Sequence, residues 1–120
     1  MAKNYVPLFR PGQTVTFGVT TGVTAGQLVE VGAADRTVTP AAAASSKVVG
    51  VAAHDAAIGD NLTVEISKPI HELVVAGAVT RGQRLESATD GKVRTLTNGT
   101  PVFLALTNAA DGTAVQALAL

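Results

Sequence analysis

Residues 48–86, VVGVAAHDAAIGDNLTVEISKPIHELVVAGAVTRGQRLE, decide the fold of this chain. Apolar and polar residues alternate through 62–66, which is the period-two pattern of a strand with one buried face. Ser67-Lys68-Pro69 interrupts the pattern, because proline cannot donate a hydrogen bond to a neighbouring strand. The apolar pattern resumes at 70–75, and glycines mark the turns that follow. The stretch predicts short strands at 48–51, 62–66 and 70–75, and the beginning of a fourth.

Three more strands are predicted before this stretch, at 14–20, 27–31 and 36–39, where β-branched and other apolar residues predominate. Residues 40–46 contain a run of alanines that favours helix but is too short to form a stable helix alone. We therefore expect a loop with one helical turn in this segment.

Glycine dipeptides organise the chain after the stretch. Asp-Gly at 90–91 and Asn-Gly at 98–99 are typical of two-residue hairpins, because type I′ turns need a positive φ at both central positions. They predict hairpins that join strands at 84–88, 92–96 and 102–106. A third such dipeptide, Asp-Gly at 111–112, precedes a last predicted strand at 114–120.

One corner of the chain is repeated. Residues 23–30, VTAGQLVE, recur as residues 79–86, VTRGQRLE, and Pro11-Gly12-Gln13 is a weaker third copy. Each copy has a glycine turn, then glutamine, then the entry to a strand. Two clear copies do not make a solenoid, which needs at least three repeats. The pattern predicts an all-β fold, a small barrel or sandwich that uses a similar corner twice.

The composition limits the classes of protein to consider. With 120 residues the chain is long enough for one domain of modest core size. Aromatic residues are only 3% of the chain, so the core must be built from Val, Leu, Ile and Ala. Nine basic and nine acidic side chains balance, which argues against a nucleic-acid partner. No apolar run approaches the roughly 20 residues that span a bilayer, and no signal peptide is visible, so no membrane partner is expected.

Catalytic and ligand-binding patterns are scarce. His54 and His71 each precede an acidic residue, but neighbouring residues of a strand face opposite sides, so a metal site is not expected. The sequence has no cysteine, no Gly-x-Ser-x-Gly elbow and no phosphate-binding loop. We predict no catalytic residue, no metal, no cofactor and no small-molecule substrate. An enzyme with an unrecognised site is the alternative, which a screen for bound ligand or metal would detect.

The two ends of the chain carry the candidate contact residues. We expect an extended arm at 1–12, followed by a single β-domain at 13–120. Prolines disfavour helix in the arm, which also contains half of the aromatic residues; a frayed terminus is the alternative. The candidate binding residues of the arm are Tyr5, Pro7, Leu8, Phe9, Arg10 and Pro11. The apolar C-terminal strand would aggregate if it were free, so it is paired or forms an oligomer interface, with Val115, Leu118 and Leu120 as candidates.

Several short motifs occur in an order that resembles the tailed-phage head decoration, or capsid cement, proteins. The similarity covers roughly residues 12–106, and one departure is Ser67-Lys68-Pro69, where related sequences tend to have glycine. The motifs are Thr24-Ala25-Gly26-Gln27-Leu28-Val29-Glu30, then Val49-Gly50-Val51-Ala52 with Asp55, Ala56 and Gly59, then a strand of valine and isoleucine, Ile70-His71-Glu72-Leu73 and Gly82-Gln83-Arg84-Leu85.

The resemblance implies a small β-barrel or β-tulip-like domain that is a structural virion protein and not an enzyme. It implies homotrimers at the three-fold and quasi-three-fold positions of an icosahedral shell, where they hold neighbouring major capsid subunits. The arm would then bind the capsid, by adding to an exposed sheet edge. The protein would be made in the host cytoplasm and end on the outer capsid surface. A phage tail component or another virion-associated β-barrel adaptor is the alternative.

Overall fold

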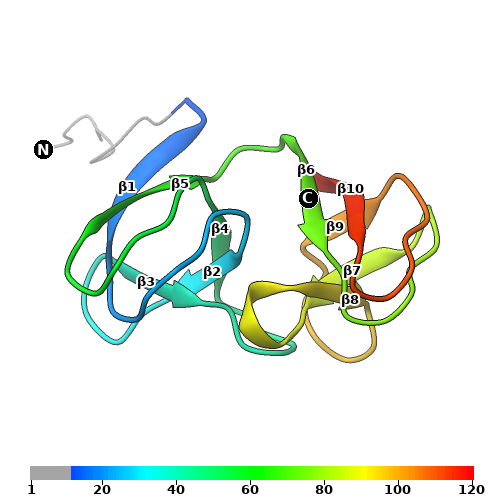
Figure 1. Cartoon of the computed structure of the whole chain (residues 1–120), viewed down its shortest axis with the longest axis horizontal. Coiled ribbons are helices and arrows are strands. Elements are labelled where there is room, and N and C mark those ends of the chain that lie inside the picture. The colour runs from blue at the N-terminus through cyan, green and yellow to red at the C-terminus, as the bar shows by residue number, and fades with distance from the viewer. Residues whose placement is uncertain (1–11) are drawn as a thin grey trace, which may run out of the picture.

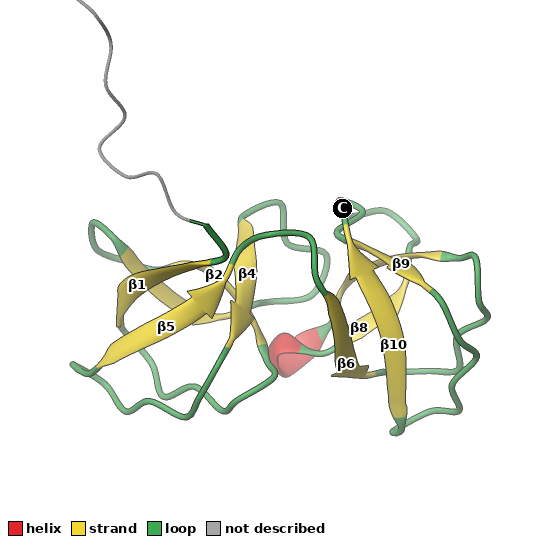
Figure 2. Ribbon diagram, turned by 90° about the horizontal axis from the view of Figure 1, so that it is seen from above, coloured by secondary structure: helices red, strands yellow, loops and turns green. Residues whose placement is uncertain are grey.

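A computed structural model describes residues 12–120, which form two five-stranded sheets lying side by side (Figure 1). The first sheet contains β1 (Thr14–Val19), β2 (Leu28–Val31), β3 (Thr37–Pro40), β4 (Val48–Ala52) and β5 (Asn61–Glu65). The second contains β6 (Ile70–Val74), β7 (Arg84–Ser87), β8 (Val93–Thr95), β9 (Phe103–Ala105) and β10 (Ala114–Ala119). A 3-10 turn, η1 (Thr89–Gly91), lies between the two sheets (Figure 2). The predicted all-β class is confirmed.

The first sheet is a closed barrel. Its strands follow the order β1-β3-β2-β4-β5, and β5 pairs with β1 to complete the ring. Alternate residues of β5 point inward, so Leu62 and Val64 are fully buried while Thr63 is partly exposed. The core of this barrel is formed by Val19, Val23, Val29, Val38, Ala52, Ala56, Leu62 and Val64. The predicted small barrel is therefore confirmed.

The second sheet repeats the strand order of the first. When β6 to β10 are matched in sequence to β1 to β5, the order β6-β10-β9-β7-β8 corresponds to β1-β5-β4-β2-β3. This is the order of the strands around the closed barrel, starting at β1 and continuing to its neighbour β5. In the second sheet, a single parallel bridge joins Val75 and Val93. It is equivalent in position to the parallel pairing of β1 with β3 in the first sheet. The chain thus contains one five-stranded unit twice, and the second copy is closed by one bridge where the first has a strand pair.

The repeated corner has the same hydrogen bonds in both halves. The backbone N–H of Thr24 donates to the Gln27 side-chain oxygen at 2.8 Å, and the N–H of Thr80 donates to that of Gln83, also at 2.8 Å. In each corner the glutamine side chain accepts the N–H of a residue that lies outside the strands. A positive φ, 85° at Gly26 and 89° at Gly82, lets the chain turn. The sequence repeat is therefore a structural corner, as predicted.

The junction of the two sheets is buried and well bonded. Leu28, Ala41 and Val51, all from the first half, belong to the core of the second sheet. The backbone N–H of Ala44 donates to the carbonyl of Ser87 at 2.8 Å, and that of Ser45 to the Ser87 hydroxyl at 2.9 Å. Buried apolar area and paired polar groups both stabilise such a junction. The single β-domain at 13–120 stays a prediction, and the shared core favours it.

Two loop predictions differ from the structure. Residues 40–46 contain no helical turn: Ala44 has a positive φ of 54° and its N–H is taken by Ser87. The Asn-Gly dipeptide at 98–99 does not form a hairpin, because β8 pairs with β7, and β9 pairs with β7 and β10. The Asp-Gly dipeptide at 90–91 does join an antiparallel pair, β7 and β8, with φ of 59° and 69°. That hairpin is confirmed.

Glu86 explains the loop at 96–99. This glutamate is fully buried, and its carboxylate accepts the backbone N–H groups of Thr97 at 3.1 Å, Asn98 at 3.2 Å and Gly99 at 2.7 Å. Arg94 pairs with the same carboxylate at 2.7 Å. The loop wraps around a buried anion instead of forming a tight turn.

We expect Gly91→Ala to destabilise the protein more than Gly82→Ala. Both glycines have a positive φ, so alanine is strained at either position. At Gly91, however, a Cβ atom would lie 2.8 Å from the carbonyl oxygen of Leu28, whereas nothing lies within 4 Å at Gly82. The additional loss in the free energy of unfolding should be about 1–3 kcal/mol, as for other overpacked sites. Denaturant unfolding of both variants measures it, and equal losses would contradict the close packing at this junction.

Candidate functional site

The two histidines lie in different settings. His54 holds a turn: its Nε2 accepts the backbone N–H of Thr63 at 3.1 Å, so its Nδ1 carries the proton that is donated to the carbonyl of Asp55 at 2.9 Å. His71 lies edge-on to Phe103, with ring centroids 6.0 Å apart. Burial lowers the pKa of His71, and the nearby carboxylate of Glu65 opposes this. Within residues 12–120 no three acidic, histidine or cysteine side chains are grouped to hold a metal ion.

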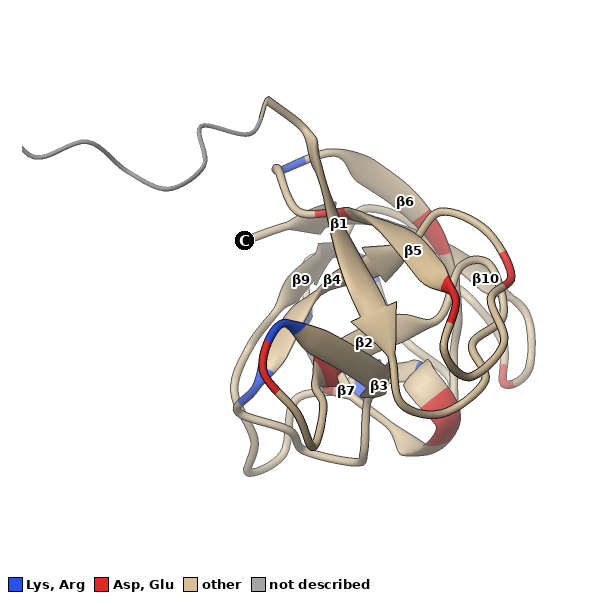
Figure 3. Cartoon of the chain, turned by 90° about the vertical axis from the view of Figure 1, so that its left-hand side faces the viewer, with Lys and Arg blue, Asp and Glu red and all other residues tan. Residues whose placement is uncertain are grey.

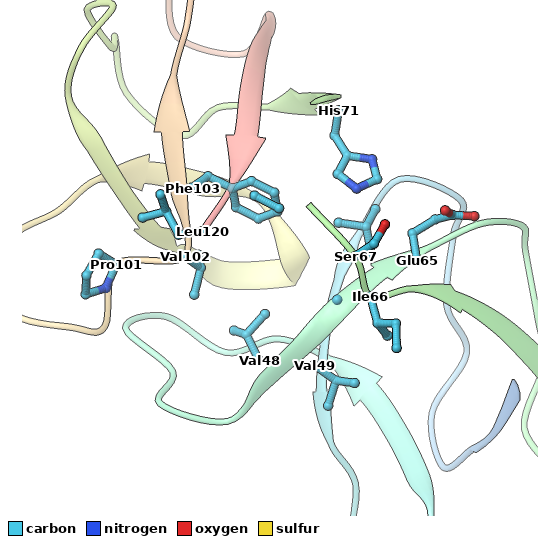
Figure 4. Close-up of a pocket in the computed structure, with 13 residues that line it drawn as sticks. Val48, Val49, Glu65, Ile66, Ser67, His71, Pro101, Val102, Phe103 and Leu120 are labelled. Carbon is cyan, nitrogen blue, oxygen red and sulfur yellow. The ribbon is translucent and has the colours of Figure 1, made fainter. Parts of the chain in front are cut away.

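A cleft separates the two sheets on the side of His71 (Figure 4). Figure 4 shows Glu65, Ser67 and His71 along one wall, and Pro101, Val102, Phe103 and Leu120 along the other. The volume of the cleft is about 120 Å³, which is close to the roughly 150 Å³ that holds one benzene ring. Small-molecule sites are usually about 300–1,000 Å³ with several convergent polar groups. The cleft is therefore smaller than a usual small-molecule site.

The C-terminal candidates have different exposures. Val115 is fully buried in the core of the second sheet, so its side chain does not reach the surface of the described structure. Leu118 is partly exposed and points outward, because Val115 and Ala117 point inward. Leu120 is 45% exposed. The surface available for a contact at this strand is formed by Leu118 and Leu120.

The six candidate residues of the arm, Tyr5 to Pro11, lie outside the described residues. The described chain begins beside the end of β5, where the carbonyl of Gln13 accepts the N–H of Ile66 at 2.9 Å. This bond continues the β1–β5 ladder by one step. Gln13, the residue that follows the predicted arm, therefore lies beside Ile66, which lines the cleft.

Apolar side chains that the sequence analysis did not select lie on the surface. Ile58 is 73% exposed on a corner of the first barrel, and Ile70 and Val74, at 61% and 46%, lie on β6. The sequence at 70–75 contained a signal for this exposure. Neighbouring residues of a strand face opposite sides, so residues next to an inward Leu73 and Val75 must point outward. Figure 3 shows the charged positions as short, separated segments of both signs. The surface is thus better suited to apolar protein contacts than to a polyanion.

The described residues define an all-β protein built from a duplicated five-stranded unit, and none of its helical segments is long and apolar enough to cross a membrane. The sequence matches the family model of the phage cement protein over residues 9–120. The chain therefore belongs to the phage cement protein family, whose members are structural proteins of phages. The resemblance noted from the sequence is confirmed.

A solved structure has the same fold. The chain is similar to the N base of the head fiber protein gp8.5 of bacteriophage phi29, with a TM-score of 0.71 and 20% sequence identity. The similarity covers 89% of this chain and 92% of that chain. At this identity the likeness shows the fold alone. No curated protein matches the sequence.

Proposed function

We propose that this chain decorates and stabilises the head of a tailed phage, as a non-enzymatic protein of the outer capsid surface that is made in the host cytoplasm. The observation that carries the proposal is the match to the phage cement protein over residues 9–120. The geometry supports it, because a rigid duplicated β-unit with exposed apolar side chains and a small cleft is suited to protein contacts.

The proposal includes the arrangement on the shell. Homotrimers bind the major capsid protein at three-fold and quasi-three-fold positions, and each arm adds to an exposed sheet edge of the shell. Three arms on one trimer act together, so that weak single contacts give firm attachment. Nucleic acid, membranes and small molecules are not partners in this proposal. The chain has nine basic and nine acidic residues, and this balanced charge supports the exclusion of nucleic acid.

Heads that lack the protein provide the test. We expect purified full-length protein to co-sediment with undecorated heads to a saturating level, and to raise the temperature at which those heads lose their contents. Electron cryo-microscopy of saturated heads should place the added density at three-fold and quasi-three-fold positions. The same heads without added protein are the control. Absence of binding, or binding that leaves head stability unchanged, would contradict a cementing function.

A second candidate is an adaptor that anchors a fibre or another virion component. The similarity of fold to a structure described as the N base of a head fiber supports it. Saturated heads distinguish the two functions. A cement raises head stability by itself, whereas an adaptor binds without this effect until its second partner is added.

A further inference from the structure

The loop at 97–99 contains Asn98-Gly99, the only Asn-Gly dipeptide in the sequence. Asparagine is chemically labile, most of all before glycine, which has no Cβ to hinder its backbone nitrogen. That nitrogen attacks the side-chain Cγ of the asparagine, and its proton passes to the side-chain NH2 group, which leaves as ammonia. Water then opens the resulting five-membered succinimide to aspartate or isoaspartate. Asn98 is exposed to solvent, so burial does not protect it from this reaction.

The attacking nitrogen is already engaged in the folded protein. The N–H of Gly99 donates to Oε1 of Glu86 at 2.7 Å, the shortest of the three backbone bonds to this carboxylate. Cyclisation removes the proton from this nitrogen, so the hydrogen bond must break first. Bonds of this kind, to an ionised acceptor, are roughly twice as strong as neutral ones. The carboxylate does not take the proton itself, because the lowered pKa of Glu86, about 2, makes it a weak base.

The rest of the loop is held by the same carboxylate. The N–H groups of Thr97 and Asn98 also donate to Oε1 of Glu86, at 3.1 and 3.2 Å. The Thr97 hydroxyl lies 3.2 Å from the side-chain oxygen of Asn98, which positions the carboxamide. A Cβ atom at Gly99 would lie 2.8 Å from the Cα of Ala44, so this part of the loop is packed against the first half of the chain. Deamidation therefore requires a local opening, which costs the contacts that it breaks.

The first half of the chain shows that the fold does not require this arrangement. Glu30 on β2 is equivalent to Glu86 on β7, and the loop after β3, residues 41–47, is equivalent to the loop after β8. There the N–H of Ala42 donates to Glu30 at 2.9 Å, and the loop contains alanine, serine and lysine but no asparagine. The carboxylate with three backbone donors thus occurs in the half whose loop carries the labile dipeptide.

The two Asp-Gly dipeptides, which cyclise in the same way with loss of water, also have engaged nitrogens. The N–H of Gly91 donates to the carbonyl of Ala41 at 3.1 Å. The N–H of Gly112 donates to the carbonyl of Val75 at 3.0 Å. At Asn98 the acceptor is a side chain, so a single substitution can remove it.

We propose that Asn98 is a deamidation site that the Glu86 carboxylate keeps closed in the folded protein. Aspartate at this position would place a second negative charge beside Glu86, and isoaspartate would lengthen the backbone by one atom next to Gly99. Either product weakens the bonds that hold the loop, so a deamidated copy is less stable than an intact one. This protection is independent of the proposed function, although it matters for a virion, whose proteins are not renewed after assembly.

The test follows position 98 in full-length protein kept in mildly alkaline buffer at physiological temperature. Peptide mapping by mass spectrometry measures asparagine, aspartate and isoaspartate at this position over time. The folded wild type should deamidate at least about tenfold more slowly than the same protein in denaturant. Glu86→Gln should deamidate at least about tenfold faster than the folded wild type, which is the effect of losing one hydrogen bond to a charged group.

Leu62→Ala is the matched control, because it removes a fully buried side chain of the first barrel and lowers the global stability without changing the loop. It should leave the rate at Asn98 unchanged. An equal rise in both variants would show that Asn98 reacts through global unfolding, and an unchanged or slower rate in Glu86→Gln would show that the carboxylate does not protect it. Either result would overturn the inference.

If Glu86→Gln does not fold, the wild type decides the question. Hydrogen exchange of the Gly99 N–H also requires its bond to Glu86 to break, so folding should slow this exchange by a factor similar to that for deamidation. A Gly99 amide that exchanges as freely as in the denatured chain would overturn the inference, as would a folded wild type that deamidates as fast as the denatured one.

Discussion

Replacing Glu86 with alanine is expected to lower the free energy of unfolding by about 3 kcal/mol, because hydrogen bonds to a charged group contribute about 1.5–3 kcal/mol each and Glu86 accepts several of them. The carboxylate of Glu86 is the common acceptor for three backbone N–H groups of the loop at 97–99 and for Arg94. Without it these donors lose their shared acceptor, and a cavity replaces the buried side chain. Equilibrium unfolding in urea measures the change.

Glu30 provides the matched control for Glu86. It occupies the equivalent place in the other copy of the repeated corner, where its carboxylate accepts the N–H of Ala42 at 2.9 Å and lies 3.9 Å from Lys47, whereas Glu86 accepts three backbone N–H groups and pairs with Arg94 at 2.7 Å. Glu30→Ala should therefore cost only about 1 kcal/mol. Equal losses for the two variants would contradict the special role of Glu86.

The same contacts make stability depend on pH. Burial alone raises the pKa of Glu86, but the N–H groups of Thr97 and Gly99, together with Arg94 and Asn98, outweigh it and lower the pKa from 4.5 to about 2. Because the pKa is lowered in the folded state, the contribution of ionised Glu86 to the free energy of unfolding is complete above pH 4.5 and is lost as the pH falls towards 2. The Glu86→Gln variant should lack this part of the acid dependence.

A chain that begins at Gln13 is expected to fold but to bind undecorated heads at least tenfold more weakly than the full chain. The strands β1 to β10 and the two core clusters are formed by residues from Thr14 onward, so we expect the shortened chain to fold. At about 25 cal/mol per Å², burial of Tyr5 and Phe9 contributes a few kcal/mol per copy before the cost of ordering the arm is subtracted. Each 1.4 kcal/mol is tenfold in affinity. Co-sedimentation at sub-saturating concentration measures the difference.

Two single changes refine this prediction. Phe9→Ala should lie between the truncated and the full-length protein, because it removes one of the two aromatic groups of the arm. Lys3→Ala is the control and should bind as the wild type does, since Lys3 is not among the candidate contact residues. Equal occupancy for the truncated and full-length proteins would show that the barrel makes the contact and that the arm is a frayed terminus.

The strands were predictable from sequence because their signal is local. Every strand boundary lies within one residue of its prediction, since the alternation of apolar and polar residues depends only on which face is buried. Leu62 and Val64 show this directly: they are two residues apart and both point into the barrel. The repeated corner was visible for the same reason, because Gln27 and Gln83 bond within their own turns.

The loops and the pairing of strands depend on distant partners. The alanine-rich segment does not form a helical turn because Ser87, more than forty residues away, binds its backbone. The Asn-Gly dipeptide at 98–99 was predicted to form a hairpin, but Glu86 binds those amides. Neither partner can be identified from local spacing. For the same reason the duplication of the whole unit, beyond its corner, was not predicted.

The candidate contact residues were predicted only in part. The apolar C-terminal strand was expected to be paired within the fold or to form an interface, and β10 is paired on both sides. The sequence could not assign its residues to faces, so Val115, which is in the core, was selected together with Leu118. Ile70 and Val74 were not selected, because their exposure depends on which sheet they join and on which side of it the neighbouring half lies.

The link between the two halves has a consequence for the assembly of a virion. Only residues 66–69 separate β5 from β6. A tether this short holds two binding surfaces at an effective concentration in the mM range, so their contact hardly responds to dilution. If the halves were separate proteins, Leu28, Ala41 and Val51 would be exposed in every unbound copy and would compete for other apolar surfaces. In one chain they are covered as soon as it folds, and only the outer surfaces remain free for contacts between molecules.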